Sequence, residues 1–193
     1  MREPRLHTPL AGARWRSPGG ALLLWEPPFA AKISLRASRA AAHRLFAAIG
    51  LPAPSAPLRA AAAGGRAALW LAPDEWLLHA PYAARQELLD AARALAGRPP
   101  PAAVDLSHRY GELLLAGEAA IRALRGVTPL DLDSFAPGSA SRTLCGKVDA
   151  VLWREGADRF RFLCGRSFTR YLFELLQFHA ISADPPAHHP AAD

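Results

Sequence analysis

The first half of the chain alternates short apolar runs with amphipathic segments, and each change of pattern predicts a new element. The runs ALLLWE at 21–26 and KISLRA at 32–37 predict two strands. Ser38 follows in the position of a helix N-cap, and apolar residues then recur every three or four positions as far as Gly50. Because a glycine followed by Pro52 is a typical helix end, we expect a helix between Ser38 and Gly50.

Two further strands and a second helix are predicted in the rest of this half. Residues 67–80 have the pattern of strand, tight turn and strand. Pro73 and Asp74 supply the turn, because proline presets φ and aspartate bonds its own backbone. Residues 82–97 carry leucines at helical spacing and end in glycine, which predicts an amphipathic helix. A rigid proline-rich linker follows at 98–103.

The second half shows the same kinds of pattern. Strands are expected at 104–107 and 111–117, as a pair joined through residues 108–110. A hairpin with its turn at 155–158 is expected within 142–165. The helices of this half are expected at 118–126 and 166–180, and a long loop at 127–141.

An internal repeat relates the two halves. Each contains strand, helix, glycine and a proline-containing loop, followed by strand, acidic turn, strand and helix, at an offset of about 80 residues. Units with more than one strand per helix predict an α+β fold, here of two pseudo-symmetric α/β repeats with antiparallel or mixed sheets. The expected boundaries are a flexible arm at 1–19, a single unit at 20–180 made of repeats at about 20–98 and 103–180, and a disordered tail at 181–193.

Composition and charge exclude several classes of function. Of the 193 residues, 51% are hydrophobic, which is typical of a chain that folds around a core. The net charge is +6, but the 23 lysines and arginines are scattered, so we expect no nucleic-acid partner, and an acidic protein subunit fits the charge equally well. Because no apolar run approaches the ~20 residues of a membrane span and no signal peptide is visible, we expect no membrane partner and a cytoplasmic location.

The stretch VDLSHRYGELLLAG at 104–117 raises the question of a catalytic site. It brings together Asp105, Ser107 and His108, the residue types of a nucleophilic triad. Side chains two or three positions apart on an extended chain point in different directions, and the sequence has no Gly-x-Ser-x-Gly elbow. We therefore favour a structural interpretation, in which Asp105 and Ser107 hydrogen-bond the turn and His108 packs at the corner.

Other candidate chemistry is sparse. The histidines are scattered among different predicted elements without the spacing of zinc ligands, so no metal site is expected. The absence of a glycine-rich phosphate motif argues against a flavin or NAD site in this chain. Cys145 and Cys164 lie within apolar runs without a Cys-x-x-Cys spacing, which predicts two reduced thiols in the core.

Several motifs resemble those of a known fold group. Residues 104–132 and 146–172 resemble consecutive segments of the folate-binding aminomethyltransferases of the glycine-cleavage T-protein type. LWLAPDEWLL at 69–78, PLDLDSFAPGSASRT at 129–143 and FLCGRSFTRYL at 162–172 look more like a shorter branch, the gamma-subunit family of heterotetrameric sarcosine oxidases. The resemblance covers about 32–178, most of the expected core, and the near-200-residue length also fits.

The resemblance implies a folate-binding aminomethyltransferase-like fold in one subunit of a flavoenzyme complex. That complex oxidatively demethylates sarcosine to glycine, and the one-carbon unit goes to tetrahydrofolate or leaves as formaldehyde. FAD, FMN, NAD and tetrahydrofolate are expected on the partner subunits, which are the large flavin- and folate-bearing alpha subunit, beta and the small delta. No cofactor is expected on this chain, which would be a structural subunit that is not catalytic by itself.

Two departures from the aminomethyltransferase pattern favour a non-catalytic role. Those enzymes carry paired aspartates at a strand entry, whereas Asp149 is followed here by Ala150. Their Met-Gly after Ser-His is replaced by Arg109 and Tyr110. The alternatives are an autonomous folate-dependent aminomethyl or one-carbon transferase with Asp149 as amine anchor, the equivalent subunit of another N-methyl amino-acid oxidising complex, or a scaffold serving another pathway.

Candidate ligand or interface contacts follow from the same comparison. They are Asp105, His108, Arg109, Arg142, Asp149 and Arg166. Arg142, Arg166 and Arg170 would bind the glutamyl tail of a folate, form ion pairs with an acidic subunit or lie on a solvated face. Trp15 stands between two arginines outside the core pattern, so we expect it to be an interface anchor.

Overall fold

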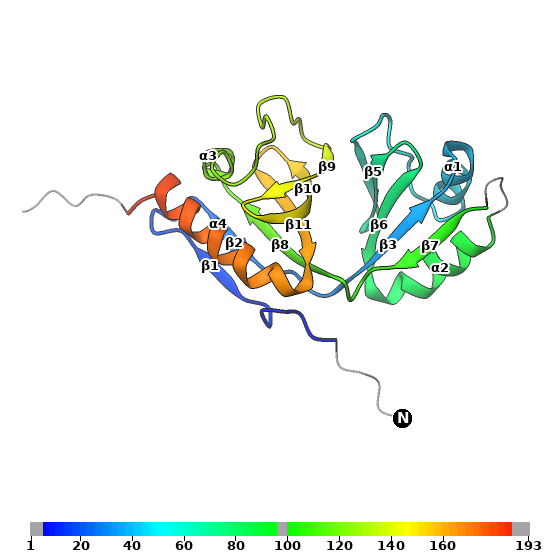
Figure 1. Cartoon of the computed structure of the whole chain (residues 1–193), viewed down its shortest axis with the longest axis horizontal. Helices are drawn as coiled ribbons and strands as arrows, with labels where there is room; N and C mark the ends of the chain where they lie inside the picture. The colour runs from blue at the N-terminus through cyan, green and yellow to red at the C-terminus, as the bar shows by residue number, and fades with distance from the viewer. Residues whose placement is uncertain (1–5, 96–99, 187–193) are drawn as a thin grey trace, which may run out of the picture. The chain divides into compact units, whose positions relative to one another are not determined.

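The chain forms two compact units, each built from one β-sheet and two α-helices (Figure 1). The computed structural model describes residues 6–95 and 100–186. Of these residues, the first unit contains 6–7, 28–110 and 138–142, and the second contains 8–27, 111–137 and 143–186. The units are therefore interleaved along the chain, and the predicted α+β class is confirmed.

The first unit is a five-stranded sheet with both helices on one face. Its elements are β3 (Ala30–Arg36), α1 (Arg39–Ala48), β4 (Ala60–Ala63), β5 (Arg66–Ala72), β6 (Glu75–Pro81), the 3-10 turn η1 (Tyr82–Ala84), α2 (Arg85–Arg93) and β7 (Ala102–Asp105). The strand order is β4-β5-β6-β3-β7, with antiparallel neighbours. Alternate residues of the central strands, such as Ile33 and Leu78, pack with Leu45 and Leu88 of the helices into one core.

Local sequence chemistry explains how this unit forms its turns and caps. The Ser38 hydroxyl accepts a hydrogen bond from the Ala41 amide at 3.3 Å, which caps α1 as predicted. Gly50 has φ +66° just after α1, a conformation that glycine adopts without steric cost. Pro73 and Asp74 separate β5 from β6 and form the predicted turn.

The second unit contains most of a six-stranded sheet in the order β1-β2-β8-β11-β10-β9, in which residue 110 of β8 and residues 140–142 of β9 count with the first unit. Its strands are β1 (Arg14–Arg16), β2 (Leu23–Trp25), β8 (Tyr110–Ala116), β9 (Ala140–Cys145), β10 (Val148–Gly156) and β11 (Arg159–Gly165), and its helical segments are α3 (Ala120–Leu124), the 3-10 turn η2 (Arg166–Phe168) and α4 (Thr169–Ala183). Leu124 of α3 and Leu172 of α4 pack with Leu113, Leu152 and Phe162 of the sheet. The stretch predicted as one hairpin thus contains three strands, because Gly146 at φ +59° makes an additional tight turn before β10.

The two sheets confirm the internal repeat and show the connectivity of its strands. The order β4-β5-β6-β3-β7 of one sheet corresponds to β9-β10-β11-β8-β2 of the other. The terminal strand of each series is exchanged: β2 precedes β3 in sequence but pairs with β8, and β7 precedes β8 but pairs with β3. The prediction that 104–107 and 111–117 form a strand pair is therefore wrong, and so are contiguous repeats at 20–98 and 103–180. Pairing between distant strands leaves no local signal in the sequence.

The expected flexible arm at 1–19 needs correction within the part that the structure describes. Residues 14–16 form β1, in which Trp15 pairs with Leu24 of β2. The buried Glu26 carboxylate accepts hydrogen bonds from the amides of Leu10, at 3.0 Å, and Gly12, at 2.8 Å. This segment belongs to the second unit, and its strand is too short to show a periodic pattern; residues 1–5 of the expected arm lie outside the described residues.

The expected tail at 181–193 begins later than predicted. Helix α4 continues to Ala183, which packs in the core. The carboxylate of Asp184 accepts hydrogen bonds from the Ser17 hydroxyl and, at 2.8 Å, from the Ala21 amide. These bonds attach the end of α4 to the β1–β2 loop, so 181–184 is folded; residues 187–193 lie outside the described residues.

Candidate functional site

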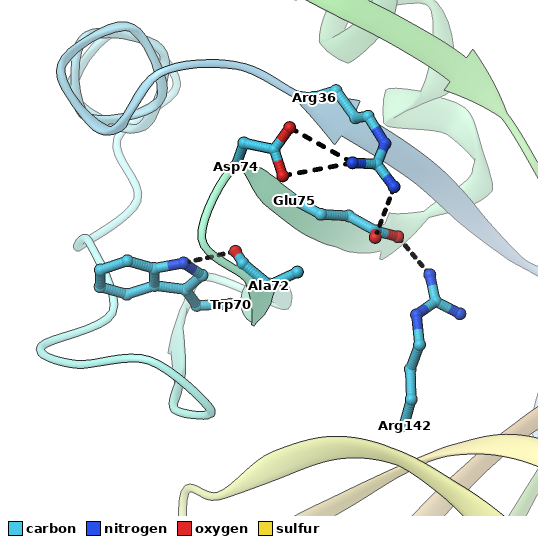
Figure 2. Close-up of polar contacts among 6 residues, drawn as sticks. All are labelled: Arg36, Trp70, Ala72, Asp74, Glu75 and Arg142. Atoms are coloured by element: carbon cyan, nitrogen blue, oxygen red, sulfur yellow. Dashed lines mark hydrogen bonds and ion pairs between the residues drawn. The ribbon is translucent and has the colours of Figure 1, made fainter.

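One candidate cluster surrounds the turn between β5 and β6 in the first unit, shown in Figure 2. Arg36 of β3 donates to the Asp74 carboxylate at 3.2 Å and to Glu75 at 3.1 Å. Arg142 donates to the other oxygen of Glu75, so that this carboxylate lies between two guanidinium groups. Trp70 Nε1 donates to the Ala72 carbonyl at 2.7 Å and fixes the backbone on the opposite side of the turn.

The electrostatics of this cluster are balanced. Glu75 is only 7% exposed, whereas the side chains of Arg36 and Arg142 are 58% and 50% exposed. Burial lowers the pKa of Arg142, but its hydrogen bonds to Tyr110 and Glu75 outweigh this and raise the pKa above its ordinary value. Arg142 is therefore engaged by Glu75 before any anionic ligand arrives.

A second cluster lies at the corner that follows β7. The Asp105 carboxylate accepts hydrogen bonds from the Ser107 amide at 2.9 Å, from the Ser107 hydroxyl at 2.5 Å and from Arg85 Nε at 2.5 Å. Ser107 Oγ in turn accepts from the Lys32 amide at 3.0 Å. Burial raises the pKa of Asp105, but the hydrogen bonds from Ser107 and Arg85 outweigh it, so the pKa lies below its ordinary value.

His108 lies in an aromatic environment at the same corner. Its Nε2 is 3.4 Å from the Tyr82 hydroxyl, and its ring centroid is 4.9 Å from that of Phe29. The Ser107 hydroxyl donates its hydrogen bond to Asp105. In a Ser-His-Asp triad the serine hydroxyl donates to the histidine instead, so this arrangement is not that of a triad. The structural interpretation of Asp105, Ser107 and His108 fits this geometry.

Lys32 is a buried residue of this corner that the sequence did not reveal. It is 1% exposed, its ammonium donates to the Ala30 carbonyl at 3.2 Å, and it lies 5.2 Å from the Phe29 ring centroid. The only available signal in the sequence was a lysine in an otherwise apolar strand. Lysines near strand ends are also common on the surface, so this signal did not indicate burial. Arg109 is exposed, and its amide closes the turn by donating to the Leu106 carbonyl at 3.0 Å.

The remaining predicted residues belong to the second unit. Asp149 is exposed near the start of β10, and Arg166 is half-buried at the start of η2. Trp15 is half-buried and packs against the core, so the premise that it lies outside the core is wrong. The structure thus brings Asp105 and His108 to one corner and places Arg142 in a separate cluster of the same unit.

A buried charge network in the second unit was not predicted. Arg161 of β11 forms ion pairs with Glu112 of β8 and with Glu155 of β10, and all three side chains are at least 87% buried. Glu155 also accepts from Arg159 at 2.6 Å. Burial lowers the pKa of Arg161 to about 10, which still leaves it charged at neutral pH. The alternation of charged residues along β11 predicts that they lie on an exposed face, and only the folded structure shows that Arg161 is buried.

Metal and thiol chemistry find little support among residues 6–95 and 100–186. Within these residues, no group of three or more histidine, cysteine, aspartate or glutamate side chains is arranged to hold a metal ion. Cys145 and Cys164 are free and buried, as predicted. Burial raises their pKa values to about 12 and about 11, which disfavours the nucleophilic thiolate. None of the described helices is long and apolar enough to cross a membrane.

Comparison with known proteins places these features in a family. The chain is 36% identical over 157 residues to sarcosine oxidase subunit gamma of Corynebacterium sp. (strain U-96), covering 78% of this chain and 75% of that protein. It is 35% identical over 176 residues to the subunit of the same name from Arthrobacter sp., covering 88% and 85%.

Solved structures agree with these sequence matches. A chain of the heterotetrameric sarcosine oxidase from Corynebacterium sp. U-96, in complex with pyrrole 2-carboxylate, matches with a TM-score of 0.77 and 32% identity over 87% of this chain and 88% of that chain. The glycine cleavage system aminomethyltransferase T from Bartonella henselae shares the fold, with a TM-score of 0.59 and 18% identity over 79% of this chain and 44% of that chain. A family model described as sarcosine oxidase, gamma subunit family, matches residues 34–183. The chain therefore belongs to the sarcosine oxidase gamma subunit family.

Proposed function

We propose that this chain is a structural, non-catalytic subunit of a heterotetrameric sarcosine oxidase complex, which oxidatively demethylates sarcosine to glycine. The observation that carries the proposal is the match to a chain of the Corynebacterium complex over 87% of this chain and 88% of that one, with a TM-score of 0.77. Because so little of either chain lies outside the shared fold, membership of the same kind of assembly is the role that fits best.

The polar clusters of the first unit support a structural role. The carboxylates of Glu75 and Asp105 are both paired with guanidinium groups of the same unit. A general base for an amine or hydroxyl needs a carboxylate or imidazole that faces its substrate, and an anion site needs cations that are not already neutralised. Arg142, a candidate for the glutamyl tail of a folate, is engaged by Glu75 instead.

The cofactors and partners follow from this proposal. FAD, FMN, NAD and tetrahydrofolate would be held by the alpha, beta and delta subunits, and the one-carbon unit would pass to tetrahydrofolate or leave as formaldehyde there. This chain would stabilise the assembly through its surface, in the cytoplasm. Asp149, Arg166 and Trp15 then remain predicted interface contacts.

Co-expression tests the proposal directly. The tagged chain is produced together with the proposed alpha, beta and delta subunits, and the purified material is analysed by size-exclusion chromatography and by oxygen uptake with sarcosine. We expect a stoichiometric complex whose yield falls when this chain is omitted. Failure of the wild-type chain to co-purify contradicts the proposal.

A titration of the isolated chain separates the structural role from catalysis. Calorimetry with tetrahydrofolate is expected to show no binding, because Arg142, the candidate of the first unit for the glutamyl tail, is already paired with Glu75. Micromolar binding would instead favour the alternative of an autonomous folate-dependent transferase, and Asp149→Ala would then be the variant that tests its amine anchor.

A further inference from the structure

Helix α4 buries one apolar face in the core, and large apolar residues also recur along its exposed side. Leu172, Leu176 and Ala180 are completely buried beneath it. The opposite side carries large apolar residues at helical spacing, which we call the outer face of α4. It consists of the exposed residues Phe168, Tyr171, Phe178 and Ile181, together with Leu175, which is half-buried and also packs against the core.

The exposure of the outer face is large for a helix that already covers a core. Phe178 is 66% exposed, Phe168 52% and Ile181 45%. Single exposed apolar residues are common on protein surfaces, but aromatic side chains that recur along one helix face form the kind of patch that marks an interaction site. Phenylalanine and tyrosine are also enriched at the centres of interfaces.

The outer face is held in place before any partner binds. The Tyr171 hydroxyl accepts a hydrogen bond from the Lys147 amide at 3.4 Å. A Cβ placed on Gly146 would lie 2.7 Å from that hydroxyl and 2.5 Å from Leu175 Cδ2, so both side chains rest closely on the β9–β10 turn. The Phe178 ring packs edge-on against His179 with centroids 5.4 Å apart. Side chains that are already ordered lose less entropy when they bind.

The charges around the outer face indicate what kind of surface would cover it. Arg170, which precedes Tyr171, and Lys147, whose amide bonds the Tyr171 hydroxyl, are both exposed, and at the C-terminal end of α4 Arg122 Nε donates to the Ala183 carbonyl at 2.8 Å. Among the charged residues of α4 itself, Glu174 is the acidic one that borders this face. The rim is therefore predominantly basic.

A second copy of this chain fits such a rim poorly. In a twofold contact the same patch faces itself, so basic residues would oppose basic residues across the interface. A surface with an apolar centre and carboxylates around it would bury the phenylalanines and neutralise the rim together. The net charge of +6 for the whole chain has the same sign.

We propose that the outer face of α4 is a docking surface for another subunit of the complex, one that presents an apolar patch bordered by acidic residues. This inference rests on the proposed function. Phe178 and Tyr171 are its central anchors, and Arg170 is the rim residue that selects an acidic partner.

The test uses the tagged chain co-expressed with the proposed alpha, beta and delta subunits. Tyr171→Ser combined with Phe178→Ser is expected to reduce the recovered partner subunits at least about tenfold, because truncating a central aromatic anchor has an effect of this size. Leu58→Asn is the matched control: this leucine is 48% exposed in the first unit at φ +59°, a conformation that asparagine tolerates, and recovery should not change.

Two further arms keep the test decisive. Arg170→Glu changes an exposed charge without touching the core, and it is expected to weaken recovery and to remove part of its sensitivity to salt. Thermal unfolding of each isolated variant checks folding, and the serine variant should still unfold cooperatively, with a Tm lowered by a few °C because Tyr171 loses its contacts with the β9–β10 turn. If that variant fails to fold, Arg170→Glu alone decides.

Three outcomes are distinguishable. If the wild-type chain recovers no partner, the proposed function fails. If the wild type assembles and both sets of variants assemble equally well, the proposed function stands and the docking surface is refuted. If the isolated wild type dimerises in light scattering and the serine variant does not, the outer face binds a second copy and the acidic partner is refuted.

Discussion

The close approach of Gly111 in β8 to Thr169 at the start of α4 gives the sharpest prediction on stability. A Cβ placed on Gly111 would lie 1.8 Å from Thr169 Oγ1, 2.9 Å from its Cβ and 3.0 Å from its Cγ2. Thr169 is completely buried, and its hydroxyl donates to the Arg166 carbonyl at 2.9 Å. Rotating the threonine away would break that hydrogen bond, so an added methyl group requires a shift between strand and helix.

Gly111→Ala should therefore destabilise the protein by about 1–3 kcal/mol, the usual effect of overpacking a core. In a chain of this size each kcal/mol lowers Tm by about 2–4 °C, so we expect a fall of about 2 to 12 °C. Thr169→Ala removes two of the three close atoms. The double variant should then lose less stability than the sum of the two single variants, because the collision is shared between the sites.

Urea unfolding followed by tryptophan fluorescence measures these free energies. Gly156→Ala is the matched control, since the nearest atom to a Cβ there is Arg159 Cβ at 3.9 Å, and it should change stability by no more than about 0.5 kcal/mol. Additive effects of Gly111→Ala and Thr169→Ala, or a Gly111→Ala protein as stable as the control, would refute this close packing of β8 against α4.

Three other predictions follow from the folded charges and termini. Asp105→Asn should lower the free energy of unfolding by about 1–2 kcal/mol at neutral pH. Because the folded pKa of Asp105 is lowered, this contribution is complete above the unfolded pKa of about 3.9 and disappears as the pH falls through the folded pKa. The stabilities of variant and wild type should therefore converge in acid, and a constant difference across a pH series of urea melts contradicts the prediction. Removal of residues 1–19 deletes β1 and the amides that bind Glu26, so we expect the free energy of unfolding to fall by about 3–5 kcal/mol in denaturant melts. An unchanged unfolding midpoint would mean that the segment does not contribute to stability. Cys145 and Cys164, with pKa values raised to about 12 and about 11, should react with a thiol reagent at pH 8 only as the protein unfolds, and complete labelling of the native protein within minutes would show that they are accessible.

Local chemistry in the sequence was enough to predict many elements of the fold. Ser38 caps α1 and Pro73 with Asp74 turns the chain between β5 and β6, because each of these effects depends on residues only a few positions apart. The repeat was visible for the same reason, as the same local pattern occurs twice. The exchange of β2 and β7 was not visible, because strand pairing depends on contacts between residues far apart in the chain.

The contacts within the candidate clusters also divide into local ones, which were predictable, and long-range ones, which were not. The contacts between Asp105 and Ser107 span two positions and followed from turn chemistry. The pairing of Arg142 with Glu75 spans 67 positions, and nothing in either local sequence identifies the other residue. Trp15 was misplaced because a three-residue strand carries no periodic signal, so that a tryptophan packed on the core looked like one outside it.

The exchanged strands also affect the order in which the chain folds during synthesis. Leu24 of β2 pairs with Leu115 of β8, so β2 leaves the ribosome roughly 90 residues before this partner, and until then only β1 is available to pair with it. Helix α4, which completes the core of the second unit, is the last of the described elements to be made. Long-range pairing of this kind slows folding and exposes apolar strands to aggregation. Slow translation or low temperature should therefore improve the yield of this chain more than that of a protein with only neighbouring strand pairs.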